Sequence, residues 1–179
     1  MIRRDLGYSD PPESLPLIGI RARSDALIHV MGGFAGGTRV DETDDRTLDN
    51  MLDMNYRAAF FVARAVLPHM RKQNEGRILA VASRQAVEPQ ALVGAYSASK
   101  AALVSIVHTI ALENREHRIS ANTVLPATMD TPANRAAMPS ADYSRWVQPG
   151  SVAALLVHLA SGAGAAVTGA AIGVYGGQV

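Results

Sequence analysis

The chain has 179 residues, with 17 basic and 16 acidic side chains, no cysteine and 48% hydrophobic residues. This length suits one domain with a sizeable core, and the composition excludes an intrinsically disordered chain, a disulfide scaffold and a Cys-ligated zinc site. A net charge of +1 without a basic stripe gives no reason to expect nucleic acid, and the five scattered histidines give none to expect a metal.

Strand and helix patterns alternate along the chain. Residues 1–24 begin polar and Pro-rich and are predicted to form an irregular arm, within which 15–22 is a candidate strand that Pro16 weakens. The remainder, 25–179, is expected to be a single domain. Apolar runs predict strands at 26–30, 77–82, 119–125 and 170–175, and 3.6-residue periods or apolar length predict helices at 43–72, 95–113 and 152–160.

Local signals mark the ends of the first long helix: Thr43 or an Asp beside it can cap the start, and Asn74-Glu75-Gly76 can end it. The stretch 146–179 carries no Asp, Glu, Lys or Arg and is, by length alone, a candidate membrane span. Because glycines interrupt it at 161–164, we expect a buried helix and strand instead, and no membrane association. With no signal peptide pattern and no cysteine, a cytoplasmic location is expected.

This alternation predicts an α/β fold, a Rossmann-like parallel sheet with helices on both faces. In such sheets ligands bind at the carboxyl ends of the strands. Those ends are 31–37, 83–90, 126–131 and 175–177.

Three of the predicted elements carry residues whose side chains could take part in catalysis. Tyr96 and Lys100 lie four residues apart at a helix start and so share a face, where an ammonium group would favour the phenolate and make Tyr96 usable as a general acid/base. Ser83 ends a strand, where it could reach a substrate over Tyr96, although serine there is more often part of a turn. Asn55 falls on the apolar face of its helix, so it must be hydrogen-bonded to backbone or water.

From about residue 25 to 177 the chain resembles the short-chain dehydrogenase/reductase family. The pieces that carry the resemblance occur in the family's order and spacing: DALIHVMGG, DMNYRAAFFVARAVLPHM, GRILAVAS, YSASKAAL, ISANTVLPATMDTP and TGAAIGVYGG.

The resemblance implies that Tyr96 is the general acid/base, and that Lys100 lowers its pKa and holds the nicotinamide ribose of NADH or NADPH. It further implies that Ser83 hydrogen-bonds the carbonyl or imine of a small-molecule substrate, and that Asn55 anchors a water in a proton relay. The remaining implied cofactor contacts are Gly32 and Gly33, beside the adenosine ribose, and Pro126, Met129 and Thr131, at the nicotinamide end.

Two stretches, 25–37 and 124–146, are most similar to the quinoid dihydropteridine reductases within that family, which implies a pteridine-like substrate. Ser83 departs from that type, which generally lacks the serine. The other departures from the family's pattern are Val30 where Asn is usual, Ala127 where Gly is common, and Tyr175 where Asp is usual.

The family's usual opening, a strand, a TGxxxGxG turn and a helix that bind the pyrophosphate, does not precede Asp25. The glycines at 32–37 do not lead into an apolar helix, and those at 162–164 precede a strand, so neither set is expected to replace that turn. The domain is therefore predicted to be N-terminally truncated, with weak or absent NAD(P)H binding in the chain as given.

Three hypotheses about function stay open. The chain is an active oxidoreductase that holds its cofactor through the nicotinamide half, with or without help from 1–24; an inactive family member serving as a binding or oligomerisation module; or a fragment of a full-length reductase. In-frame TGxxxGxG codons upstream would support the last. The strand at 26–30 would be an exposed edge, so we expect 15–22 or a second subunit to cover it, in a homodimer or homotetramer.

Overall fold

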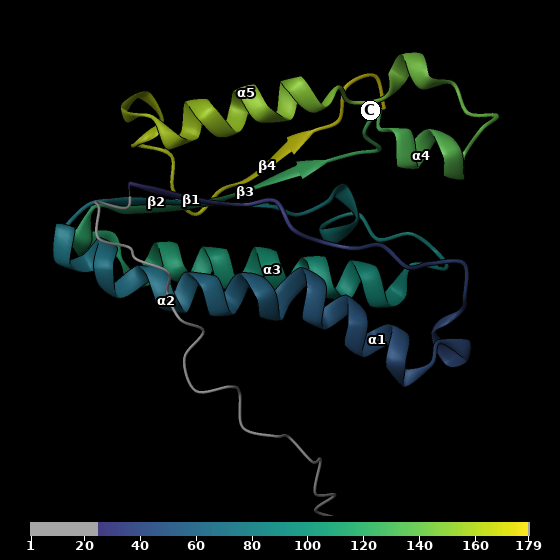
Figure 1. Ribbon diagram of the computed structural model, residues 1–179, viewed down its shortest axis with the longest axis horizontal. Coiled ribbons are helices and arrows are strands. Elements are labelled where there is room, and N and C mark those ends of the chain that lie inside the picture. Colours follow the sequence, from purple (N-terminus) through teal and green to yellow (C-terminus); the bar gives the residue numbers. More distant parts are fainter. Residues whose placement is uncertain (1–24, 179) are drawn as a thin grey trace, which may run out of the picture.

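Four parallel strands form the single sheet of the computed structural model, which describes residues 25–178 (Figure 1). The predicted arm at 1–24, with its candidate strand, lies outside the described residues. The sheet order follows the sequence: β1 (Ala26–His29), β2 (Gly76–Val81), β3 (Ile119–Pro126) and β4 (Ala171–Val174). Each predicted strand is confirmed, with its bounds shifted by a single residue.

Helices cover both faces of this sheet, which confirms the predicted Rossmann-like class (Figure 1). One face carries α2 (Ala58–Gln73) and α3 (Gly94–Glu113), with α1 (Asp45–Leu52) leading into them. The other face carries α5 (Pro149–Ala160). A short helix, α4 (Pro132–Ala137), forms after β3 where the sequence predicts none, with Pro132 at its first turn.

Alternation along the central strands divides the core into two layers. In the β2–β3 register Ile78 pairs with Ala121, and both face the layer of α2 and α3. Leu79 and Val124 point to the opposite face and pack under α5. β3 is buried along its whole length, because a strand in the middle of a parallel sheet is covered on both sides.

The first long helix is not continuous as predicted. α1 and α2 are joined by a π-helical turn at Asp53–Arg57, whose wider winding centres on Asn55. The predicted ends are confirmed, since the side chain of Asp44 accepts a hydrogen bond from the Thr47 amide and Asn74 stops α2 in the left-handed conformation at φ 56°.

The charge-free C-terminal stretch forms a helix and a strand, α5 and β4, as predicted. The predicted burial is wrong for β4, whose residues are exposed or half-buried because it is an edge strand among the described residues, and it holds for only one side of α5. Among the described helices, α3 is the one long and apolar enough to cross a membrane by length and composition. It packs against β2, β3 and α1 as the central helix of its layer.

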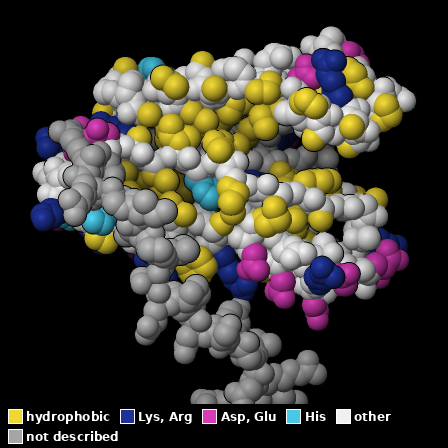
Figure 2. Space-filling model, viewed as in Figure 1, with side chains coloured by type: hydrophobic (Ala, Val, Ile, Leu, Met, Phe, Trp, Pro, Cys, Tyr) yellow, Lys and Arg dark blue, Asp and Glu magenta, His cyan; other side chains and the backbone are white. Residues whose placement is uncertain are grey.

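β1 is an edge strand within the described residues, pairing there with β2. Hydrophobic side chains gather between the layer of α5 and the layer of α1 and α2 on the side seen in Figure 2. Around the end of β1 the exposed apolar side chains are Ile28, Val30, Met31 and Phe34. The predicted exposure of this edge is thus observed within residues 25–178.

Candidate active site

The carboxyl ends of the first three strands meet at one edge of the sheet, and most of the predicted site residues lie there. Gly32 and Gly33 follow β1, Ser83 follows β2, and Pro126 ends β3. The backbone amide of Ala82 donates to the carbonyl of Val124, which keeps the ends of β2 and β3 together.

The first turns of α3 bring Tyr96 and Lys100 to this edge. The ammonium group of Lys100 is buried and donates to the carbonyl oxygen of Val81, at 3.0 Å from Nζ, near the end of β2. Burial lowers the pKa of Lys100 from 10.5 to about 8, because the charged form loses hydration. An amine with this pKa titrates near physiological pH, so its charge responds to small changes in its surroundings.

Tyr96 is half-buried, and Ser83 lies near its phenol. The Ser83 hydroxyl itself donates to Gln85 Oε1 and accepts from the Gln85 amide at 3.3 Å. Burial raises the pKa of Tyr96, and the neighbouring Ser83 hydroxyl partly offsets this. The ring of Phe34 packs edge-on against the Tyr96 ring, with 5.0 Å between centroids. The family resemblance implies a Tyr96 pKa lowered by Lys100, whereas here burial dominates and the pKa moves upward.

Asn55 is fully buried and ties three elements together. Its Oδ1 accepts from the amide of Gly33 at 2.9 Å, and its Nδ2 donates to the Gly33 carbonyl at 3.0 Å and to Ser99 Oγ at 3.0 Å. The sequence left open whether Asn55 hydrogen-bonds backbone or water. In the structure it hydrogen-bonds the backbone of Gly33, and so joins the end of β1 to the π-helical turn and to α3.

Gly32 is required by close approach rather than by an unusual backbone angle. A Cβ atom there would lie 2.7 Å from Asn55 Oδ1 and 2.8 Å from Lys100 Nζ, closer than a real Cβ tolerates. Because Gly32 has no side chain, the amide of Asn55 and the ammonium group of Lys100 can both lie close to its Cα atom.

Two neighbours of the site were not singled out in the sequence. His29 is buried on β1, its Nε2 has no hydrogen-bond partner, and burial with the nearby Lys100 lowers its pKa. Side chains alternate between the two faces of a strand, so within 26–30 His29 lies on the same inward face as Leu27. This alternation is the sequence signal that could have identified His29. Phe34 lies among glycines, and no local pattern predicts its contact with Tyr96.

The loop after β3 is held by its own contacts. Thr131 caps α4, since its hydroxyl accepts from the amide of Asn134 at 3.2 Å, and the Asn134 side chain donates to the Met129 carbonyl at 2.8 Å. Arg135 makes a bidentate ion pair with Asp130, which lowers the pKa of that carboxyl to about 2. Met129 and Thr131 therefore belong to a structured loop beside the strand edge.

Two further points raised by the sequence have a structural answer, one at this edge and one at the opposite edge of the sheet. Tyr175, where the family usually has Asp, lies under the guanidinium of Arg84, 4.7 Å from the ring centroid. The glycines at 162–164 form a tight turn after α5, where a Cβ on Gly164 would lie 2.5 Å from the Leu159 Cα, so they serve helix packing.

A family model described as short chain dehydrogenase matches residues 21–141. The chain belongs to the short-chain dehydrogenase/reductase family. It is 30% identical over 172 residues to short-chain dehydrogenase/reductase cdmF of Talaromyces verruculosus, covering 85% of this chain and 67% of that protein. It is 31% identical over 182 residues to 4-formylbenzenesulfonate dehydrogenase of Comamonas testosteroni, covering 88% of this chain and 72% of that protein.

The chain is also similar to solved structures of this family. An oxidoreductase of the short-chain dehydrogenase/reductase family from Burkholderia thailandensis superposes with a TM-score of 0.79 at 31% identity, covering 89% of this chain and 66% of that one. The chain thus spans about two thirds of the length of these relatives. The similarity of two stretches to dihydropteridine reductases stays a prediction.

Proposed function

We propose that this chain carries the catalytic portion of an NAD(P)-dependent oxidoreductase, acting on the carbonyl or imine of a small molecule, with Tyr96 as general acid/base. The observation that carries the proposal is the proximity of Tyr96 and Ser83 at the carboxyl edge of the sheet, with Lys100 buried one turn further along α3. Family membership supports the reaction type.

The side chains divide the chemistry between them. A raised pKa keeps the Tyr96 phenol protonated at neutral pH, so it can donate its proton to a substrate oxygen or nitrogen in the reducing direction. The Ser83 hydroxyl, which lies near that phenol, would hold the same substrate atom by turning its proton from Gln85 Oε1 to the substrate. A bound nicotinamide supplies or accepts the hydride.

The donors at this edge fit the ribose next to a nicotinamide. Lys100 Nζ uses one donor on the Val81 carbonyl, and an ammonium group has three, so donors remain for ribose hydroxyls. The glycines at 32–37 lead to a 3₁₀ turn at Val40–Glu42 rather than into a helix start, so the fit within residues 25–178 covers the nicotinamide half of a dinucleotide. We therefore expect weak binding of NADH and NADPH by this chain.

Direct titration tests the cofactor step. NADH and NADPH fluorescence should show weak or no saturation with the chain as given, and micromolar affinity would contradict the expectation. Adding an in-frame upstream TGxxxGxG segment, where the coding DNA contains one, should tighten binding if the chain is part of a longer reductase.

Measurements of turnover test the assignment of Tyr96 as the general acid/base. An aromatic aldehyde and a quinonoid dihydropterin should be offered as substrates, because the second tests the pteridine-like specificity that two stretches of sequence favour. Tyr96→Phe should abolish turnover while the circular dichroism spectrum and melting temperature change little. Tyr143→Phe, which alters a tyrosine in the loop after α4, should leave turnover intact. Full activity in Tyr96→Phe would reject the assignment.

We also propose that the chain assembles as a homodimer or homotetramer and acts in the cytoplasm. The support for assembly is the apolar edge at β1, because exposed strand edges and apolar patches of this kind are normally covered.

A further inference from the structure

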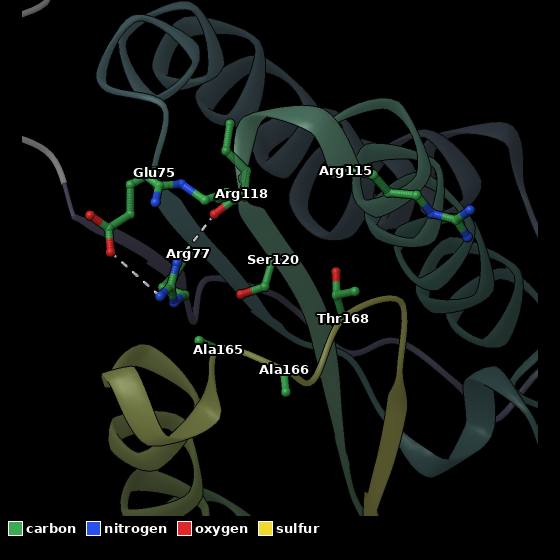
Figure 3. Close-up of a pocket in the computed structure, with 9 residues that line it drawn as sticks. Glu75, Arg77, Arg115, Arg118, Ser120, Ala165, Ala166 and Thr168 are labelled. Atoms are coloured by element: carbon green, nitrogen blue, oxygen red, sulfur yellow. Dashed lines mark hydrogen bonds and ion pairs between the residues drawn. The ribbon is translucent and has the colours of Figure 1, made fainter.

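A hollow lies at the opposite edge of the sheet from Tyr96, where β2 and β3 begin (Figure 3). Its volume is about 520 Å³. The residues that matter for the argument come from both strand starts, from the turns before them and from the segment after α5: Glu75, Arg77, Arg118, Ser120, Ala165 and Ala166.

The hollow follows from the register of the sheet and from small side chains. Arg77 and Ser120 are partners across β2 and β3, so both point to the face that α5 covers further along. Here small side chains, Ser120, Ala165 and Ala166, are among those that line the hollow, and they leave space beside Arg77 that larger residues would fill.

Two buried polar atoms in this hollow have no hydrogen-bond partner. They are Arg77 Nε and Ser120 Oγ, in residues that are 8% and 3% exposed. Figure 3 shows the Ser120 hydroxyl turned toward Arg77 across the floor of the hollow. Buried donors without partners are rare and costly, so two together beside one hollow favour a ligand that they can reach by a small shift of these side chains.

The charge around the hollow is positive. Arg77 uses its Nη1 on the backbone carbonyls of Gly76 and Arg118, and its Nη2 lies 3.7 Å from Glu75 Oε1. Arg118 lies on the same side, with its Nε on the carbonyl of Asn74, whereas Arg115 also lines the hollow but extends away from this group (Figure 3).

We propose that this hollow binds the phosphate group of a small molecule, through the guanidinium of Arg77, the hydroxyl of Ser120 and the guanidinium of Arg118. A phosphate offers three terminal oxygens, which suits donors arriving from two strands and a turn, and guanidinium groups bind phosphate with charge-assisted hydrogen bonds. The Glu75 carboxylate competes with the anion for Arg77. The volume leaves room for the rest of an esterified molecule beside Ala165 and Ala166.

Isothermal titration of the full chain with inorganic phosphate, against chloride and acetate at equal ionic strength, tests this. Phosphate should bind saturably at one site. Arg77→Gln should weaken binding about tenfold or more and Ser120→Ala about threefold to tenfold, as expected for bonds to a charged ligand. Glu75→Gln should tighten binding, a gain that a damaged fold would not produce.

Two controls separate this site from other effects. Arg46→Gln removes one positive charge from exposed α1 and should leave phosphate affinity unchanged. Tyr96→Phe should also leave it unchanged, so this proposal and the proposed oxidoreductase can fail separately.

The proposal is overturned if chloride binds as well as phosphate, if Arg46→Gln weakens binding as much as Arg77→Gln, or if Glu75→Gln weakens it. Acetate binding as tightly as phosphate would overturn the phosphate assignment in favour of a carboxylate. Should Arg77→Gln fail to fold, Ser120→Ala and Glu75→Gln decide the question.

Discussion

At the scale of single residues, the candidate site depends on how closely polar groups approach the end of β1. Asn55 and Lys100 come from helices far apart in the sequence, and both reach the space above Gly32. The backbone at Gly33 is held on both its amide and its carbonyl by Asn55. The strand end is therefore positioned by side-chain hydrogen bonds as well as by the sheet.

Gly32→Ala should be destabilising, because its Cβ would lie within 3 Å of Asn55 Oδ1 and Lys100 Nζ. We expect a loss of about 1–3 kcal/mol in the free energy of unfolding, typical of overpacking. Gly150→Ala is the matched control, since nothing lies within 4 Å of a Cβ there, and it should be neutral or stabilising by about 0.4–1 kcal/mol. Chemical denaturation measures both, and equal effects would contradict the steric argument.

Lys100 should make stability depend on pH. The ordinary pKa of lysine, 10.5, applies to the unfolded chain, whereas burial lowers the pKa of Lys100 to about 8 in the folded chain. Between pH 8 and 10.5 the unfolded state therefore binds more protons than the folded state, and the free energy of unfolding rises with pH. Below pH 8 both states are protonated and the cost of burying the charge is fully present. Lys100→Met should flatten this rise.

Urea midpoints between pH 7 and 10.5 measure the rise, with Lys72→Met on the exposed end of α2 as the control that keeps it. An unchanged pH profile in Lys100→Met would mean that another group causes the dependence.

At the scale of elements, the helix before β2 differs most from its prediction. Hydrophobic period and capping residues locate both ends, since these signals are local. The π-helical turn at Asp53–Arg57 has no such signal, because it is stabilised by the bonds from Asn55 to Gly33 and Ser99 on other elements. The short helix α4 was likewise not predicted, because its six residues make too few helical turns for a 3.6-residue hydrophobic period to be recognised.

Pro68→Ala should stabilise α2. Pro68 is exposed inside the helix, so it removes a backbone hydrogen bond without contributing buried contacts. We expect a gain of about 1–3 kcal/mol, reduced by the greater freedom of the unfolded chain. Pro132→Ala at the first turn of α4 is the control and should give no gain, because proline is favoured there. Thermal unfolding distinguishes them, and a lower melting temperature for Pro68→Ala would contradict the argument.

At the scale of the whole molecule, the sheet has one face covered by α2 and α3 and the other by α5, and among the described strands β1 and β4 are the edges (Figure 1). The apolar side chains around the end of β1 are exposed within the described residues. A second copy of the chain would bury them, so the assembly proposed above is expected to involve this edge.

Val30→Lys should therefore shift the chain toward monomer in sedimentation velocity runs over a range of concentrations, because a charge opposes burial of this edge. Val157→Lys is the matched control, since Val157 on α5 is 66% exposed and Val30 is 68% exposed. A wild-type chain that stays monomeric at all concentrations, or an equal response in both variants, would contradict an interface at β1.

The sequence by itself determined the order of the elements, the parallel sheet, the edge where ligands are expected, and the shared face of Tyr96 and Lys100. All of these depend on hydrophobic period or on spacing within one element, which neighbouring residues specify. Only the tertiary structure decided the proximity of Ser83 to Tyr96, the attachment of Asn55 to Gly33, and the burial of His29 beside Lys100. It also revealed the hollow at Arg77 and Ser120. These features depend on distances between elements far apart in the chain, and those distances are set by how the helices pack against the sheet.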